Sequence, residues 1–493
     1  MASPPDRSEN PSNRRLLKVS RLTDPTATRF LAHLRRALHE ATLTVSAMVA
    51  AAAAAAWLDP GPASAVLGAV LALSLARSHL AAARHGWREA FATLPVVSLG
   101  TLAIGALLHH LPWVGALAFI GVVALVVWLR RFGPLAQRVG RLVSLPLATI
   151  LVVPPLPHDG RWGGSPAATL LVPMAVALAA LAAVWLAQRV GRLLGWLSPP
   201  PAAAATAAPP AAPSALKPPP QVRLALQMMA ALAGAFVVGL LVFPAHWRWV
   251  VLTAFLVNSG SLGGIDVLRK SVLRVLGAAA GTVLAMAVAG HAGADPATLG
   301  ALILACIFAG VFLRIFGYGW WVLAVTLALA LLQSLEPAAA PLLLWQRVLE
   351  IVIGAVIGVA AAWFVFPIQS VDILRRRLAG ALAAMAEALD PETAERLPEK
   401  VAGPMLLVTQ MRPVFRAHRL ARRRAALQPV EWIDALAACE APVIALASRG
   451  ETPGAVRQAI GAARKAMREP AQIGAALVAL RDALSRAQAP TAP

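Results

Sequence analysis

Long apolar runs with few charges alternate with short polar segments along most of the chain. In the first half these runs lie at about 41–58, 62–76, 90–111, 113–129, 142–156 and 166–187, and in the second half at about 222–243, 248–261, 272–290, 297–313, 319–335 and 347–366. A helix that crosses a bilayer needs about 20 apolar residues, and 18 or more with few charges indicate a candidate span. The pattern therefore predicts an all-α, polytopic membrane protein with about twelve transmembrane helices.

A change of composition separates the two sets of runs, and another follows the second set. Residues 193–220 are rich in Pro and Ala, which predicts a low-complexity linker that is partly stiff polyproline. After the last run, charged residues return, and apolar residues recur at helical spacing at Ile473, Leu477, Leu480 and Leu484. We therefore divide the chain into a polar N-terminus (1–37), a first six-helix unit (38–192), the linker (193–220), a second six-helix unit (221–367) and a small helical C-terminal domain (368–493).

Arginine and lysine gather in every second loop. They follow the even-numbered runs, for example as Arg130 and Arg131 after the fourth run and Arg375 to Arg377 after the twelfth, whereas the intervening loops carry little positive charge. Cytoplasmic loops of membrane proteins collect Lys and Arg. The alternation predicts that both termini and the C-terminal domain are cytoplasmic.

The two six-helix units share short sequence features at one constant spacing. Leu129–Gly133 (LRRFG) recurs 184 residues later as Leu313–Gly317 (LRIFG), and the same shift carries Pro60 to Pro244. Because six is an even number, both units would enter the membrane in the same direction. This predicts a parallel internal repeat, related by an axis along the membrane normal. Chance similarity is the alternative, but the matching loop charges and helix counts favour duplication.

Composition serves mainly to exclude other classes of protein. Hydrophobic residues make up 59% of the chain and charged residues only 14%, against roughly 25% in soluble domains, so lipid is the expected surroundings. The net charge of +21 is explained by arginine-rich loops, and no nucleic-acid partner is expected. Cys306 and Cys439 lie far apart and predict neither a disulfide framework nor a metal site. Without a Walker A loop or a catalytic cluster, we expect neither an enzyme nor a cofactor.

The end of the eighth run is the strongest candidate for a binding site. The second and eighth runs are short, and the eighth ends in Asn258–Gly264 (NSGSLGG), with Ser259 and Ser261 inside it. Paired short segments of this kind indicate the binding site of many transporters. Glycines and hydroxyls at membrane depth would allow a broken helix, and a helix restarting near Ile265 would direct its N–H groups at an anion. The alternative is an ordinary cytoplasmic turn.

Few ionisable residues lie near the apolar runs, and those that do are candidates for a substrate path. They include Asp266, Arg269, Arg274 and Arg314. Charges inside a bilayer are costly and therefore indicate function. Arg274 could pair with a substrate carboxylate or with Asp266. Alternatively, Arg274 and Arg314 are anchors whose charged ends reach the cytoplasmic interface.

Two further patterns concern helix packing. Arg347 and Glu350 are three residues apart on the twelfth run, so they share a helical face, toward its periplasmic end. A neutralised pair that fixes packing is the favoured interpretation, and a proton relay through Glu350 is the alternative. Gly277 with Gly281 and Gly354 with Gly358 form G-x-x-x-G faces, which predict close helix approach.

Three pieces of the second half follow one another in a recognisable order: Trp247 and Trp249 at the start of the eighth run, then Arg274–Gly281 (RVLGAAAG), and finally Arg347–Gly354 (RVLEIVIG), which leads to Phe366 and Pro367. In these pieces the second half resembles the fusaric-acid-resistance-like family, which includes aromatic-acid exporters. The resemblance covers roughly residues 221–367 and extends more weakly over 40–190.

This resemblance implies a bacterial inner-membrane protein that exports aromatic carboxylic acids or related compounds, in some members with a periplasmic adaptor protein. Two departures from the family leave the substrate class and the adaptor open. The sixth run has no counterpart of Arg347 and Glu350, and the large cytoplasmic domain usual between the halves is reduced to the linker.

Residues and resemblance together favour a secondary exporter of small amphipathic organic anions, with Arg274 and the segment 258–264 in the substrate path. The proton gradient is the expected energy source because no nucleotide site is visible. Two alternatives stay open: a passive anion channel, and a non-transport envelope protein that acts through its cytoplasmic tail. The sequence decides neither the substrate nor the oligomeric state, so a homo-oligomer is also open.

Overall fold

A computed structural model describes residues 25–60, 62–76, 86–129, 132–152, 166–197, 220–289, 296–333, 341–390, 399–421, 428–451 and 453–488. Most of the predicted polar N-terminus and of the Pro/Ala linker lies outside these ranges. Within them the regular structure is helical throughout, so the all-α prediction is confirmed.

Each predicted apolar run overlaps one helix over most of its length. The first six are α2 (Pro25–Leu58), α3 (Pro62–Ala76), α4 (Gly86–His110), α5 (Pro112–Leu129), α6 (Pro134–Val152) and α7 (Pro166–Leu193), and the next six are α8 (Pro220–Val242), α9 (Trp247–Asn258), α10 (Gly264–Ala289), α11 (Pro296–Leu313), α12 (Tyr318–Gln333) and α13 (Pro341–Phe364). Proline begins most of them because it fixes a helical φ and lacks an N–H that the first turn could not pair anyway. Alanine and leucine, both strong helix formers, supply most of the interiors.

Eight helical segments of the described chain are long and apolar enough to cross a bilayer, which indicates a multi-pass membrane protein. They are 31–58, 86–110, 112–129, 170–193, 221–242, 264–287, 298–316 and 345–364. Parts of α3 and α12 are apolar but shorter, and α9, with 12 residues, reaches only about 18 Å. The number of twelve spans therefore stays a prediction.

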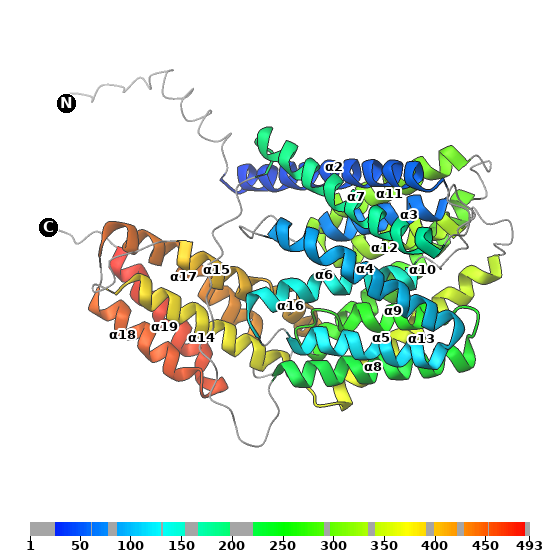
Figure 1. Cartoon of the computed structure of the whole chain (residues 1–493). Helices are drawn as coiled ribbons and strands as arrows, with labels where there is room; N and C mark the ends of the chain where they lie inside the picture. Colours follow the sequence, from blue (N-terminus) through cyan, green and yellow to red (C-terminus); the bar gives the residue numbers. More distant parts are fainter. Residues whose placement is uncertain are drawn as a thin grey trace, which may run out of the picture.

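The helices α2–α13 form one apolar bundle, in which corresponding pairs pack together in each half (Figure 1). In the first half, α2 packs on α3 and α7, and α4 on α6 and α7. In the second half, α8 packs on α9 and α13, and α10 on α12 and α13. The contacts between the halves also correspond, because α5 packs on α8 and α11 on α2.

The 184-residue spacing of the sequence features coincides with helix boundaries. Both ends of α5 (Pro112–Leu129) are shifted by 184 residues to the ends of α11 (Pro296–Leu313). After each helix comes a glycine with positive φ, Gly133 at 106° and Gly317 at 147°, and the next helix begins at the following residue. These positions require the backbone freedom that glycine provides.

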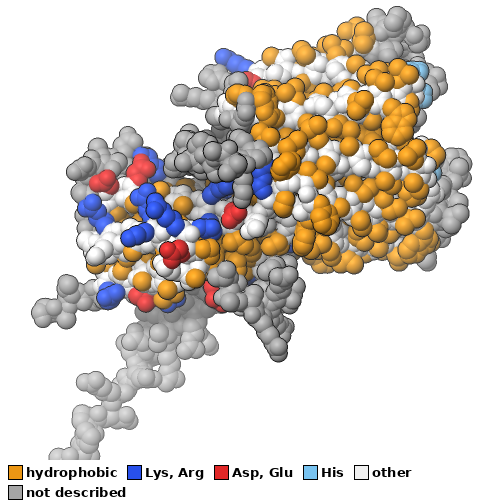
Figure 2. Space-filling view, turned by 90° about the horizontal axis from the view of Figure 1, so that it is seen from below, with side chains coloured by type: hydrophobic (Ala, Val, Ile, Leu, Met, Phe, Trp, Pro, Cys, Tyr) orange, Lys and Arg blue, Asp and Glu red, His pale blue; other side chains and the backbone are white. Residues whose placement is uncertain are grey.

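The C-terminal domain has an apolar core of its own. It consists of α14 (Ser370–Ala388), α15 (Glu399–Thr409), α16 (Arg412–Ala421), α17 (Pro429–Arg449), α18 (Gly454–Ala466) and α19 (Pro470–Gln488). The predicted apolar stripe on the last helix, with Ile473, Leu477, Leu480 and Leu484, lies fully in that core. Hydrophobic side chains cover the surface of the bundle, whereas charged side chains gather on the C-terminal domain and at its boundary with the bundle (Figure 2).

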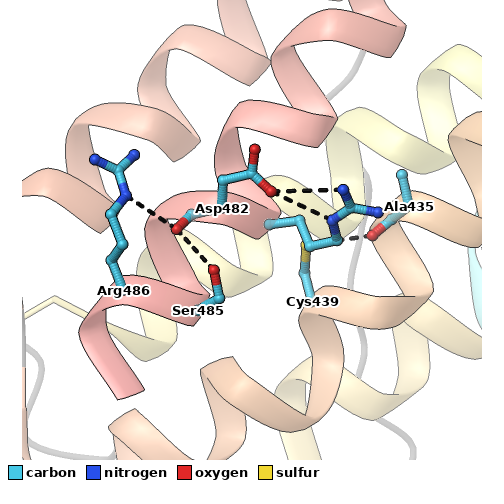
Figure 3. Close-up of polar contacts among 6 residues, drawn as sticks. Ala435, Cys439, Asp482, Ser485 and Arg486 are labelled. Atoms are coloured by element: carbon cyan, nitrogen blue, oxygen red, sulfur yellow. Dashed lines mark hydrogen bonds and ion pairs between the residues drawn. The ribbon is translucent and has the colours of Figure 1, made fainter. Parts of the chain in front are cut away.

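Cys439 belongs to this core, although the sequence places it in a polar region. Its thiol is buried on α17 and donates a hydrogen bond to the Ala435 carbonyl oxygen at 3.3 Å, close to polar contacts of Asp482 on α19 (Figure 3). Burial raises the pKa of the Cys439 thiol to about 11, although the nearby Arg481 opposes the shift.

We expect Cys439 to resist alkylation while the domain is folded. With a pKa of about 11, only about one thiol in a thousand is ionised at pH 8, and the thiolate is the reactive form. Iodoacetamide labelling of a Cys306→Ala variant, followed by mass spectrometry, should be slow in mild detergent and rapid after unfolding in guanidinium chloride. Equal rates in the two conditions would contradict the described burial.

Candidate functional site

The chain leaves the helix between α9 and α10, at the position where the sequence predicts a broken helix. We call the five non-helical residues Ser259–Gly263 the break. Gly260 and Gly263 adopt positive φ values of 59° and 97°, which side chains rarely tolerate. The helix before the break is buried over nearly its whole length, and so is its last residue, Asn258.

The break is held by side chains of α10. The Asp266 carboxylate accepts a hydrogen bond from the Leu262 N–H at 3.0 Å and forms an ion pair of 2.9 Å with Lys270. The Lys270 ammonium in turn donates to the carbonyl oxygens of Ser259 and Gly260, at 3.3 and 3.2 Å. Of the two partners considered for Arg274, a substrate carboxylate and Asp266, the structure does not favour Asp266, because Lys270, one turn away, pairs with that carboxylate.

The break also packs on the segment that connects the bundle to the C-terminal domain, Val365–Gln369, which we call the joint. The Gly264 N–H donates to the Ile368 carbonyl oxygen at 3.2 Å, and the Trp363 indole donates to the Gly264 carbonyl oxygen at 3.3 Å. A Cβ atom on Gly263 would lie 2.6 Å from the Ser370 hydroxyl, so only glycine fits there.

The joint itself is fixed by α8 and faces α10. Phe366 adopts a φ of 46°, which is uncommon for a residue with a side chain, and its carbonyl oxygen accepts hydrogen bonds from Arg223 and Gln227. Beyond the joint, burial lowers the pKa of the Arg377 guanidinium on α14, and the nearby Asp266 carboxylate opposes that shift. The broken helix and the C-terminal domain thus share one contact region.

Three buried charged side chains meet farther inside the second half, and we call them the arginine cluster: Arg274 on α10, with Arg347 and Glu350 on α13. Their exposed fractions are 6%, 3% and 1%. Arg274 lies ten residues after the first residue of α10, about 15 Å along the helix axis, and so well inside the bundle. The interpretation of Arg274 as an interfacial anchor is therefore not supported by its position.

The partners of the two arginines come from α9 and α12, besides Glu350 on α13. The Arg274 Nε donates to the Thr253 hydroxyl on α9 at 3.3 Å, and the guanidinium also interacts with Tyr318 on α12. The Arg347 guanidinium carbon lies 3.9 Å from the centre of the Trp249 ring on α9, a cation–π contact. Arg274 and Arg347 are close enough to repel each other.

Glu350 is the only acidic member of the cluster. It lies one turn after Arg347 on α13, and among the described residues neither carboxylate oxygen has a hydrogen-bond partner. The ring of His246, in the turn before α9, also lies close, with its Nδ1 4.0 Å from Glu350 Oε1. Two arginines and one glutamate leave the cluster with one excess positive charge, in surroundings where an unneutralised charge is costly.

Two other predicted residues lie away from this cluster. Arg314 forms an ion pair with Glu40 of α2, in the contact between the two halves, so it does not join Arg274. Arg269 is half-buried on α10. Sequence reasoning missed Thr253, His246 and Tyr318, although Tyr318 could have been noticed as the only tyrosine of the chain.

The four predicted packing glycines lie at close helix contacts around the cluster. On α13, a Cβ on Gly354 would clash with the Val250 carbonyl oxygen, and one on Gly358 would lie 2.6 Å from a Val257 methyl. On α10, Gly277 and Gly281 face α12 at similarly short distances. These contacts bring α9 and α12 close enough for Thr253 and Tyr318 to reach Arg274.

The chain shows similarity to one protein family. Residues 230–361 match the family described as fusaric acid resistance protein-like, and the matched segment contains Arg274, Arg347 and Glu350. The predicted resemblance is confirmed for this segment. No curated protein and no solved structure matches the chain. Together, the apolar helices and this matched segment indicate a multi-pass membrane protein.

The glycine contacts lead to a test of packing. We expect Gly354→Ala to lower the free energy of unfolding by about 1–3 kcal/mol, because the added methyl overpacks the contact with α9. The matched control is Gly300→Ala on α11, where nothing lies within 4 Å and the change should be neutral or stabilising. Thermal unfolding in detergent measures both, and equal melting temperatures for the two variants would contradict the described packing.

Proposed function

We propose that the chain is a bacterial inner-membrane secondary transporter that exports small aromatic or amphipathic organic acids. The observation that carries this proposal is the arginine cluster, with its excess positive charge inside an apolar bundle. That excess charge would attract a carboxylate from the substrate. The match of residues 230–361 to a fusaric acid resistance protein-like family also supports this proposal.

Arg274 is the member of the cluster that a substrate carboxylate would bind. Its partners Thr253 and Tyr318 are neutral, whereas Arg347 has Glu350 one turn away. A guanidinium can donate two parallel hydrogen bonds to a carboxylate, and such bonds gain strength where water is excluded. The site therefore favours an anion with a planar, bidentate acidic group over a simple halide.

The surroundings of the cluster suit a substrate with an apolar body. The Trp249 ring lies next to Arg347, and Val250, Leu252 and Phe255 of the same helix are buried. An aromatic acid could direct its carboxylate to Arg274 and bury its ring among these side chains, which would recover free energy from apolar burial. This combination supports an amphipathic acid as the substrate class.

Burial of the cluster favours a carrier over a passive anion channel. All three charged side chains are at most 6% exposed within the described part of the chain, which does not fit side chains that line a wide aqueous path. A carrier exposes its site to one side at a time, whereas a conducting pore keeps charged side chains hydrated.

The twelve spans, the parallel repeat and the cytoplasmic placement of both termini belong to this proposal. Corresponding helix pairs in the two halves, and the coincidence of α5 and α11 at a shift of 184 residues, support the repeat. An even number of spans would place both termini on one side, as the loop charges predict. A periplasmic adaptor and self-association stay predictions.

The transport proposal predicts that Arg274→Ala lowers export at least tenfold at equal protein amount, because the substrate carboxylate loses its charged partner. Uptake of radiolabelled benzoate, salicylate and cinnamate into inside-out vesicles with an imposed pH gradient measures this. Arg269→Ala, on the same helix but outside the cluster, is the matched control and should retain transport. Wild-type rates for Arg274→Ala would contradict the proposal.

A stability measurement separates a transport role of Arg274 from a structural one. If the arginine is kept for substrate binding, its buried charge costs free energy in the empty protein, and Arg274→Met should melt at an equal or higher temperature than the wild type. If it holds the helices together, the variant should melt lower. Differential scanning fluorimetry in detergent, without added acid, distinguishes the two.

A further inference from the structure

We infer that Glu350 is a built-in anion that competes with the transported acid for the two arginines, so that binding of one substrate carboxylate is coupled to uptake of one proton by Glu350. This inference rests on the proposed function of the cluster as a substrate site. It goes further by assigning a proton-binding residue and the sign of the coupling. Because acid and proton would bind together, they would cross the membrane in the same direction, and export would then follow the outward gradient of the acid instead of the inward proton gradient expected from the sequence.

The surroundings of Glu350 support a group that changes its protonation state. Its carboxylate is 1% exposed, and neither oxygen accepts a hydrogen bond within the described part of the chain. A permanently ionised carboxylate at such a site would lack the donors that normally stabilise it. The Arg347 charge, one turn away, favours the ionised form, so the two influences oppose each other.

Of the elements packed on α13, α10 and the turn before α9 bring a charged or titratable group near the pair of Arg347 and Glu350. Arg347 lies on α13 itself, Arg274 lies on α10, and His246 precedes α9, while α8 brings Arg223 only to the far end, at the joint. Nearby Trp249 is uncharged. Arg248, also on α9, lies over the Trp247 ring. Apart from Glu350, the described groups around the site carry positive or no charge.

A substrate carboxylate would shift this balance toward protonation. It would bring a second negative charge next to Glu350, and two carboxylates that share a site favour a proton on one of them. The carboxylate oxygen of Glu350 then forms an O–H bond with a proton from water and releases Arg347 to the substrate. Since linkage is reciprocal, protonation of Glu350 must in turn raise the affinity for the anion.

The charge of the cluster supports this exchange. With Glu350 ionised and no substrate, the net charge is one positive unit. With Glu350 protonated and one monoanionic substrate bound, the net charge is again one positive unit. The empty and loaded forms would therefore bury the same charge, which avoids a separate electrostatic penalty when either form changes conformation.

His246 provides a route for the proton. Its side chain is 37% exposed in the turn before α9, at the opposite end of that helix from the break, and its Nδ1 lies 4.0 Å from the carboxylate. A ring that touches both solvent and a buried acid can take a proton at one nitrogen and release one at the other.

The test measures benzoate binding to the purified full-length protein in detergent by calorimetry, between pH 6 and 8, where benzoate itself stays ionised. For the wild type we expect uptake of up to one proton per benzoate, a number that follows from comparing the binding enthalpy in buffers of different ionisation enthalpy. We also expect the affinity for benzoate to rise up to tenfold for each unit by which the pH falls. Glu350→Gln should bind benzoate with no proton uptake from this site and with nearly constant affinity.

Two further variants make the assignment specific. Glu40→Gln, which removes a carboxylate outside the cluster, should keep the wild-type pH dependence. His246→Gln should keep the equilibrium coupling but slow proton-coupled transport. Proton uptake that persists in Glu350→Gln, or that is lost in His246→Gln alone, overturns the inference and leaves the proposed function standing. Failure of the wild type to bind benzoate, salicylate and cinnamate at any pH overturns both.

Discussion

The cost of keeping two arginines inside an apolar helix bundle is the constraint that organises the second half of this protein. A guanidinium removed from water must find hydrogen bonds, an aromatic face or an opposite charge. Arg274 interacts with Thr253 and Tyr318. Arg347 interacts with Trp249 and Glu350. These four partners lie on α9, α12 and α13. The packing glycines on α10 and α13 allow the close approach on which these contacts depend.

The corresponding place in the first half shows what the bundle looks like without that constraint. There α2, α3, α4 and α7 pack through alanine, leucine and valine, and the core they form is apolar. Most of the helix pairs in contact nevertheless correspond to pairs in the second half. Among its described side chains the first half buries the Asp59 carboxylate, which accepts a hydrogen bond from Ser64, but no arginine. This difference supports the proposed functional role of the arginine cluster.

Sequence reasoning found the elements more reliably than the contacts between them. Apolar run length and proline positions fix where helices begin and end, because both act locally. The composition of Asn258–Gly264 likewise indicates the break. The partner of Asp266 was missed because Lys270 lies one turn away, whereas Arg274 lies two turns away, about 12 Å along the helix. Thr253, Tyr318 and the pairing of Arg314 with Glu40 depend on tertiary packing between helices far apart in sequence, which local patterns do not contain.

The joint after α13 connects the arginine cluster to the C-terminal domain mechanically. Arg274 is carried by the helix that begins beside Ile368, and Arg347 and Glu350 by the helix that ends just before it. A rotation of α14 would therefore move both α10 and α13. A water-soluble molecule that bound the C-terminal domain would in this way alter the distance between the two guanidinium groups without entering the lipid.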